Sequence, residues 1–214
     1  GKFSPKTIRD LESYGKPLIF VDSNTLYIGH SCVTTDLEDS VITALEYFLE
    51  HGHKEIGLLV GQEETADATP LQMDPRQRTF QQYLTEKGLY EERFVSVGQF
   101  STESGYQMME QLIQALGDDL PTAFFMASDA LAVGALRSLQ EHQISVPDRV
   151  SLISFNDTSI AKYVFPALST VTVYTEEMGK QAIQLLRQTF QGSQPSVPYM
   201  VKLATKLTIR DSSR

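Results

Sequence analysis

In the stretch Pro121–Val173, short apolar runs lie on either side of one helical pattern. This arrangement limits the fold classes that the chain can adopt. Ala123–Met126 is apolar and leads into the polar pair Ser128–Asp129, as expected of a strand that is buried on both faces. Asp129 occupies the position expected of a helix N-cap, and alanines and leucines then recur at helical spacing. Val150–Phe155 begins a second apolar strand. The order strand, helix, strand predicts a βαβ unit with parallel strands.

Polar residues lie at the carboxyl ends of both predicted strands. Ser128–Asp129 follows the first strand and Asn156–Asp157 follows the second. In open parallel sheets, ligands bind in the crevice beyond the carboxyl ends of the strands. These two pairs are therefore the first candidates for a binding site.

Apolar periodicity predicts further strands and helices along the chain. The expected strands are Pro17–Asp22, His30–Thr35, Glu55–Gly61, Phe94–Val97, Tyr199–Leu203 and Lys206–Arg210, and the expected helices begin near Thr7, Asp36, Asp74, Ser101 and Thr175. In the last of these helices, Met178, Leu185 and Phe190 recur at the spacing of a buried face. Strands that alternate with helices in this way are typical of an α/β fold with parallel sheets.

Composition and charge limit the classes of function. The chain has 214 residues, of which 41% are hydrophobic and 21% charged, as in an ordinary globular protein. No run approaches the roughly 20 apolar residues of a membrane helix, and no signal peptide opens the chain, so we expect a cytoplasmic protein without a membrane partner. The 27 acidic and 18 basic residues give a net charge of −9 at pH 7. Surfaces that bind nucleic acid are normally basic, so this chain by itself is not expected to bind DNA.

Motifs of catalysis and cofactor binding are absent from the sequence. It contains neither a glycine-rich phosphate loop nor a G-x-S-x-G elbow, and its four histidines and one cysteine show no metal-ligand spacing. Cys32 is expected to be a small core residue. The sequence therefore predicts a binding protein without a cofactor or a metal, and not an enzyme.

Five segments together carry a resemblance to a known family. They are M-A-S-D-A-L-A-V-G-A-L from Met126, I-S-V-P-D-R-V-S-L-I-S-F-N-D from Ile144, F-P-A-L-S-T-V from Phe165, G-H-K-E-I-G-L-L-V-G from Gly52 and L-T-I-R-D-S-S from Leu207. Taken together in their order along the chain, they resemble the effector-binding core of the lactose/galactose repressor family of bacterial transcription regulators. The resemblance runs from about Lys16 to Ser213.

The resemblance implies a two-lobe fold like that of type I periplasmic binding proteins, with parallel sheets flanked by helices. Residues 1–34 and 174–203 would form the remaining part of the N-terminal lobe, and residues 35–173 and 205–214 the C-terminal lobe. The first lobe would be truncated, and the DNA-binding headpiece that precedes it in the family would be absent. Crossings of the chain between the lobes would act as a hinge.

The same resemblance implies a function. The chain would be the effector-sensing and dimerisation domain of a repressor of sugar metabolism, with galactose or a β-galactoside as the effector class. Sugar bound in the cleft between the lobes would change the affinity for operator DNA, which a homodimer would contact through its headpieces. The alternative in another class is a periplasmic sugar-binding protein of a transport system, which shares this fold.

Asp22 and Arg76 are the charged candidates for sugar contacts. The resemblance places an acidic residue at Asp22, where its carboxylate would accept hydrogen bonds from sugar hydroxyls; the alternative is an Asp that caps the following turn. The spacing D-x-R-x-x-x-F-x-x-Y from Asp74 resembles the galactose and β-galactoside branch, in which the arginine matching Arg76 donates to the sugar. Arg78 faces elsewhere on the same helix and is expected in solvent.

Phe100, Ser128 and Asn156 complete the candidate site. Phe100 directly follows a predicted strand, where the resemblance implies an aromatic ring against the apolar face of a sugar, and a loop anchor is the alternative. Ser128 stands where many relatives carry Asn, so a contact through water is expected. Asn156 stands where others often have Asp, and its amide can both donate to and accept from a neutral sugar.

Overall fold

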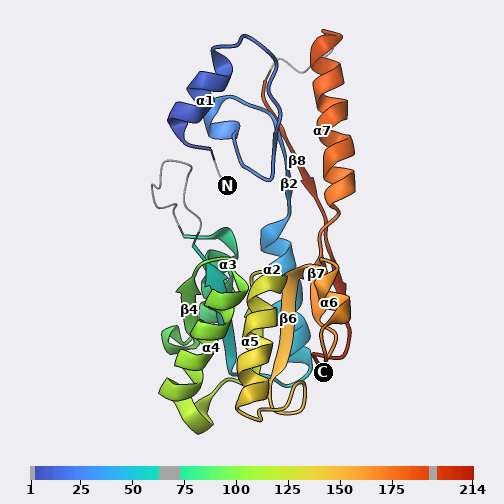
Figure 1. The fold of residues 1–214 in the computed structure, drawn as a ribbon. Coiled ribbons are helices and arrows are strands. Elements are labelled where there is room, and N and C mark those ends of the chain that lie inside the picture. The colour runs from blue at the N-terminus through green and yellow to red at the C-terminus, as the bar shows by residue number, and fades with distance from the viewer. Residues whose placement is uncertain (1–2, 63–72, 193–196) are drawn as a thin grey trace. The chain divides into compact units, whose positions relative to one another are not determined.

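The computed structural model describes residues 3–62, 73–192 and 197–214. The described chain forms two compact units (Figure 1). Unit 1 contains residues 3–36, 173–192 and 197–205, and unit 2 contains residues 37–62, 73–172 and 206–214. Among the described residues the chain therefore passes between the units after Asp36, Thr172 and Thr205.

A mixed sheet forms the centre of unit 2. Its described strands, in spatial order, are β4 (Val95–Gly98), β3 (Ile56–Gly61), β5 (Ala123–Met126), β6 (Ser151–Asn156), β7 (Ser169–Thr172) and β9 (Lys206–Thr208). Neighbouring strands are parallel except for β7 and β9, which are antiparallel. The strands β5 and β6 are parallel neighbours joined by a helix, which confirms the predicted βαβ unit.

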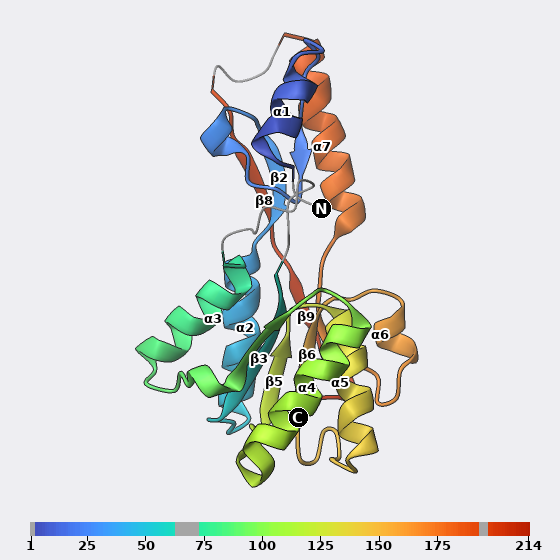
Figure 2. The ribbon, with the colours of Figure 1, turned by 60° about the vertical axis from the view of Figure 1, so that its left-hand side comes forward.

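Helices cover both faces of this sheet, with α2 and α3 on one face and α4 and α5 on the other (Figure 2). The helices of unit 2 are α2 (Leu37–Glu50), α3 (Pro75–Glu86), α4 (Thr102–Leu116), α5 (Asp129–Glu141) and the single turn α6 (Ile160–Tyr163). Because the inner strands β3 and β5 are covered on both sides, every one of their residues is buried. This explains why they read as continuous apolar runs and not as alternating ones.

The helices α4 and α5 approach each other closely through two glycines. A Cβ atom on Gly105 would collide with the carbonyl oxygen of Leu131, and one on Gly134 with that of Thr102. Only a residue without a side chain fits at these positions, so the two backbones pack directly against each other.

Unit 1 is built on a small parallel sheet. Its described strands lie in the order β1 (Phe20–Val21), β2 (Cys32–Thr35) and β8 (Met200–Leu203), and its helices are α1 (Pro5–Glu12) and α7 (Thr175–Phe190). Cys32 is fully buried in a cluster with Ile8 and Phe20, as expected of a core residue. A second cluster joins Val33 to α7.

Two expectations for unit 1 were wrong in detail. Phe190 was assigned to the buried face of α7, but 69% of its surface is exposed, whereas Met178 and Leu185 are buried as predicted. The strand expected at Pro17–Asp22 shortens to the two residues of β1. None of the helices among the described residues has the length and apolar character needed to cross a membrane.

Candidate ligand-binding site

Four of the five predicted site residues lie at the carboxyl edge of the sheet in unit 2. Arg76 is in the first turn of α3, Phe100 follows β4, Ser128 follows β5 and Asn156 ends β6. The parallel order of β4, β3, β5 and β6 brings these chain ends to one edge. Asp22 belongs to unit 1 and directly follows β1.

Arg76 is held by its own helix and by a neighbouring strand end. Asp74 caps α3: its Oδ1 accepts from the main-chain N–H of Arg76 at 2.8 Å and from Nε at 2.9 Å, and its Oδ2 accepts from Nη2 at 2.7 Å. Nη1 donates to the carbonyl oxygen of Ala127, beside Ser128, at 2.6 Å. Only 11% of the Arg76 side chain is exposed, so the guanidinium is fixed before any ligand arrives.

Two aromatic rings flank the Arg76 guanidinium. Its carbon lies 4.9 Å from the ring centre of Phe100 and 5.2 Å from that of Phe155. Gly61, at the end of β3, leaves room for the Phe100 ring, which a Cβ atom on that glycine would strike. The sequence did not single out Gly61 or Phe155; a glycine at the end of a buried strand was the available signal for a close approach.

The guanidinium keeps donors for a ligand. Arginine carries five N–H bonds, and contacts with described residues engage three of them: Nε, one on Nη1 and one on Nη2. A planar fork held by a carboxylate can donate to hydroxyl oxygens while the half-buried ring of Phe100 beside it contacts C–H groups. This combination suits a polyhydroxylated ligand.

Ser128, and not Asp129, is the N-cap of α5, which corrects the sequence-based assignment. Ser128 has an extended backbone, and its hydroxyl oxygen accepts from the main-chain N–H of Leu131 at 3.2 Å. Asp129 is the first helical residue instead. Either residue type can cap a helix, and here the extended backbone of Ser128 decides. The Ser128 hydroxyl proton has no acceptor within the described parts of the chain, so it can still be donated to a ligand or a water.

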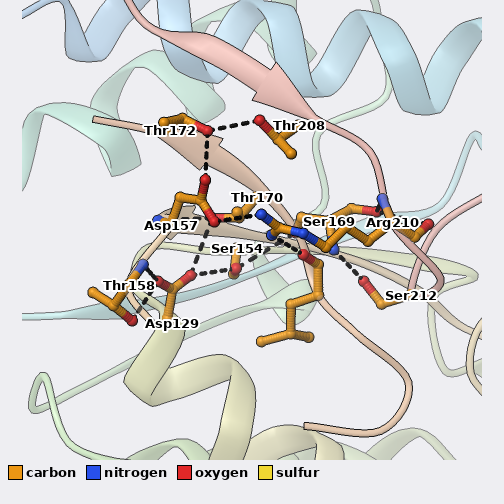
Figure 3. Close-up of polar contacts among 11 residues, drawn as sticks. Asp129, Ser154, Asp157, Thr158, Ser169, Thr170, Thr172, Thr208, Arg210 and Ser212 are labelled. Atoms are coloured by element: carbon orange, nitrogen blue, oxygen red, sulfur yellow. Dashed lines mark hydrogen bonds and ion pairs between the residues drawn. The ribbon is translucent and has the colours of Figure 1, made fainter. Parts of the chain in front are cut away.

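Asp129, which follows Ser128 in the chain, is buried and accepts four hydrogen bonds from neighbouring elements (Figure 3). Its Oδ1 accepts from the hydroxyls of Ser154 at 2.5 Å and Thr170 at 3.0 Å. Its Oδ2 accepts from the main-chain N–H of Thr158 at 2.6 Å and from the hydroxyl of that residue at 2.8 Å. The carboxylate thus ties α5 to β6, β7 and the loop after Asn156.

Asn156 is exposed and ends β6 with an unusual backbone. Its φ is 108°, and that of Asp157 is 55°. Residues with a side chain adopt positive φ uncommonly, although Asn and Asp do so more readily than most. Such strain is found most often where the chain presents groups to a ligand.

Asp22 and Arg78 are both exposed. Asp22 has a φ of 57°, and its main-chain N–H donates to the carbonyl oxygen of Val33 at 2.9 Å. Its part in a site shared with unit 2 therefore stays a prediction. Arg78 lies two residues after Arg76 and points to solvent, as expected from its place on the helix.

A separate hollow on unit 1 contains none of the predicted site residues. It measures about 480 Å³ and is lined by the segments that lead into β1, β2 and β8 together with α7, including Lys16, His30 and Tyr199. His30 pairs with Glu12 at 2.8 Å, and the Tyr199 hydroxyl donates to Gln188 at 2.9 Å. We place the candidate site at the sheet edge of unit 2, where the polar groups converge. Within the described ranges no cluster of three or more His, Cys, Asp or Glu could hold a metal ion.

Comparison with known proteins identifies the family. Residues 45–213 match the family described as periplasmic binding protein-like domain. Over its whole length the chain is 51% identical to the HTH-type transcriptional regulator GalR of Streptococcus thermophilus and 36% identical to GalR of Lacticaseibacillus casei, and it spans 64% of each of these relatives. A solved structure, the transcriptional regulator CelR-cellobiose complex, superposes with a TM-score of 0.83 at 25% identity over 98% of this chain and 63% of that one.

The chain belongs to the periplasmic binding protein-like domain family, which confirms the predicted α/β fold with parallel sheets flanked by helices. Within that fold it corresponds to the effector-binding domain of regulators of the lactose/galactose repressor family, as the sequence motifs predicted. The relatives are named as regulators, and not as enzymes or transport receptors.

Proposed function

We propose that the chain is the sugar-sensing domain of a transcriptional repressor and that its ligand binds at the carboxyl edge of the unit 2 sheet. In this proposal Arg76 donates to sugar hydroxyls, Phe100 contacts the C–H face of the ring, and Asn156 donates and accepts. Ser128 acts through water, and the carboxylate of Asp22, in unit 1, accepts hydrogen bonds from sugar hydroxyls. Galactose or a β-galactoside is the proposed effector class.

One observation carries this proposal: the Arg76 guanidinium is fixed by Asp74 and Ala127 beside the ring of Phe100, and two of its N–H bonds are not engaged by any residue that the structure describes. A neutral sugar needs fixed donors near an apolar face, and this site offers both. The bound sugar named for the solved relative, cellobiose, supports the same ligand class. The two units would correspond to the two lobes, for which the sequence predicts residues 1–34 and 174–203 in the N-terminal lobe and residues 35–173 and 205–214 in the C-terminal lobe.

The regulatory part of the proposal needs the complete chain that contains these residues. There a homodimer would contact operator DNA through headpieces outside this sequence, and the sugar would shift operator affinity by its differential affinity for two states. The cytoplasm is the proposed compartment. Sedimentation of the complete chain, with and without sugar, tests the dimer.

Calorimetric titration with galactose, lactose, allolactose and cellobiose tests the ligand site. Arg76→Ala and Asn156→Ala are each expected to weaken binding by about 1.5–3 kcal/mol, as for the loss of a hydrogen bond from a charged group or of one that leaves its partner unsatisfied in the complex. Arg78→Ala is the matched control, because the same residue type is removed from the same helix at an exposed position. Its affinity is expected to stay that of the wild type.

The outcomes separate the possibilities. Equal losses in Arg76→Ala and Arg78→Ala would point to a general charge effect and against the site. A wild-type protein that binds none of galactose, lactose and allolactose would contradict the proposed effector class. Sugar binding that leaves operator affinity unchanged in the complete chain would contradict the regulatory mechanism.

A further inference from the structure

The unusual backbone at Asn156 must be held by its surroundings. Two successive residues, Asn156 and Asp157, have positive φ angles of 108° and 55°. Residues with a side chain adopt such angles at a cost in free energy, and the conformation persists only where other contacts fix it. Asn156 is exposed, and its backbone pairs with Thr172 at the end of the β6–β7 ladder. The side-chain contacts that hold the turn are those of the next residue, Asp157.

Both carboxylate oxygens of Asp157 accept hydrogen bonds from side chains outside the turn, those of Arg210 and Thr172 (Figure 3). Oδ1 accepts from Nη2 of Arg210 at 2.7 Å, and Oδ2 accepts from the hydroxyl of Thr172 at 2.9 Å. Its main-chain N–H donates to the hydroxyl oxygen of Thr170 at 3.3 Å. Arg210 is fixed in turn, because its Nη1 donates to the carbonyl oxygen of Leu168 at 2.7 Å. The turn is therefore clamped onto β7 and onto the segment after β9.

These partners lie near two of the places where the chain passes between the units. Thr172 is the last residue of unit 2 before the chain enters unit 1, and β9 begins at Lys206, the first residue after the chain returns. The hydroxyls of Thr172 and Thr208 lie 2.7 Å apart. Thr172 has one proton and gives it to Asp157, so Thr208 donates to Thr172. A chain of hydroxyls thus runs from β9 through β7 to the turn that presents Asn156.

We propose that Asp157 is a positioning residue that fixes Asn156 for the ligand and links it, through Thr172 and Thr208, to the strands that join unit 2 to unit 1. The inference rests on the proposed function, since Asn156 is the ligand-binding residue there. Ligand held by Asn156 stabilises the turn, and the turn stabilises the hydroxyl chain. Coupling of this kind is reciprocal, so weakening the hydroxyl chain weakens the binding of the ligand.

Two substitutions at Thr172 distinguish a role of its hydroxyl in hydrogen bonding from a role of its side chain in packing. Thr172→Val keeps the shape and removes the hydroxyl, whereas Thr172→Ser keeps the hydroxyl and removes a methyl group. In the complete chain, calorimetry with galactose, lactose, allolactose and cellobiose is expected to show affinity lowered about tenfold in Thr172→Val and within about threefold of wild type in Thr172→Ser. A packing role predicts the reverse order, because valine matches threonine in shape.

Hydrogen exchange supplies a second readout. In the wild type, saturating sugar is expected to slow amide exchange in β9, and Thr172→Val is expected to lose this slowing at equal saturation. Thr208→Val removes the far end of the hydroxyl chain and is used in the same way if Thr172→Val does not fold. It is expected to lower affinity by about threefold.

Each outcome decides a separate point. A wild type that binds sugar while Thr172→Val or Thr208→Val binds equally well and keeps the slowed exchange would overturn the inference and leave the proposed function standing. A wild type that binds none of the sugars overturns the proposed function and the inference with it. Loss in Thr172→Val with rescue in Thr172→Ser supports both.

Discussion

At the scale of single residues, Asp129 is a buried carboxylate whose stability depends on its hydrogen-bond donors. The residue is 1% exposed, and its carboxylate accepts four hydrogen bonds, two on each oxygen. Asp129→Asn keeps the shape of the side chain, but it replaces one oxygen by an NH₂ group that faces two hydrogen-bond donors and cannot accept from them. We expect the free energy of unfolding to fall by about 3 kcal/mol, as when buried partners of a charged group are left unsatisfied. Denaturation in urea measures this change.

Asp118→Asn is the control for that measurement. Asp118 is exposed in a single 3-10 turn after α4, and its side chain has no partner among the residues that the structure describes. Its substitution is expected to change the free energy of unfolding by less than about 0.5 kcal/mol. Equal effects of the two substitutions would mean that the four hydrogen bonds to Asp129 contribute little.

The residues of the site were predictable to different degrees. Arg76 and Arg78 were distinguished because helix periodicity sends positions two residues apart to different faces. The role of Asp129 was missed, because Ser and Asp are equally good caps and only the backbone of Ser128 separates them. Phe155 lies beside Arg76 because of the order of the strands in the sheet. The local sequence around either residue does not reveal that order.

At the scale of helices and strands, burial decided which predictions succeeded. The strands β3, β5 and β6 are covered on both faces, so their apolar runs mark them clearly. At β1 the apolar run predicts a strand of six residues, whereas only two residues pair with the neighbouring strand. The ends of a strand are set by hydrogen bonding, which the apolar run does not reveal. The single turn α6 was missed, because four residues are too few to show a period.

The contact between α4 and α5 leads to a prediction at this scale. Alanine is the better helix former, so Gly134→Ala would normally stabilise α5 by about 0.5–1 kcal/mol. Here the added methyl would strike the backbone of α4 at Thr102, which cannot move aside as a side chain can. We expect a net loss of about 2 kcal/mol in the free energy of unfolding, the range of an overpacked core. Thermal unfolding followed by circular dichroism measures it.

Gly179→Ala is the matched control within another helix. Gly179 lies in α7, and a Cβ atom there would meet nothing within 4 Å. The same substitution is therefore expected to raise the free energy of unfolding by about 0.5–1 kcal/mol. Stabilisation by both substitutions would show that α4 and α5 are not in backbone contact at Gly134.

At the scale of the whole molecule, charge separates sensing from DNA binding. The 214 residues carry a net charge of −9, whereas affinity for DNA comes largely from basic groups that neutralise phosphates. The chain also spans 64% of its regulator relatives, so the proposed operator contact depends on residues outside it. The two activities of the proposed repressor are thus expected to reside in different parts of the complete protein.

This separation predicts that residues 1–214 alone do not bind operator DNA, while the complete chain does. Fluorescence anisotropy with a labelled operator duplex is measured for both proteins at about 50 and 200 mM salt, because contacts between basic residues and phosphates weaken steeply over that range. The complete chain is expected to lose affinity by orders of magnitude between the two concentrations, and residues 1–214 to show no binding at either. Salt-sensitive binding of DNA by residues 1–214 would show that this chain has a basic surface despite its net negative charge. The prediction that sensing and DNA binding reside in different parts of the complete protein would then be wrong.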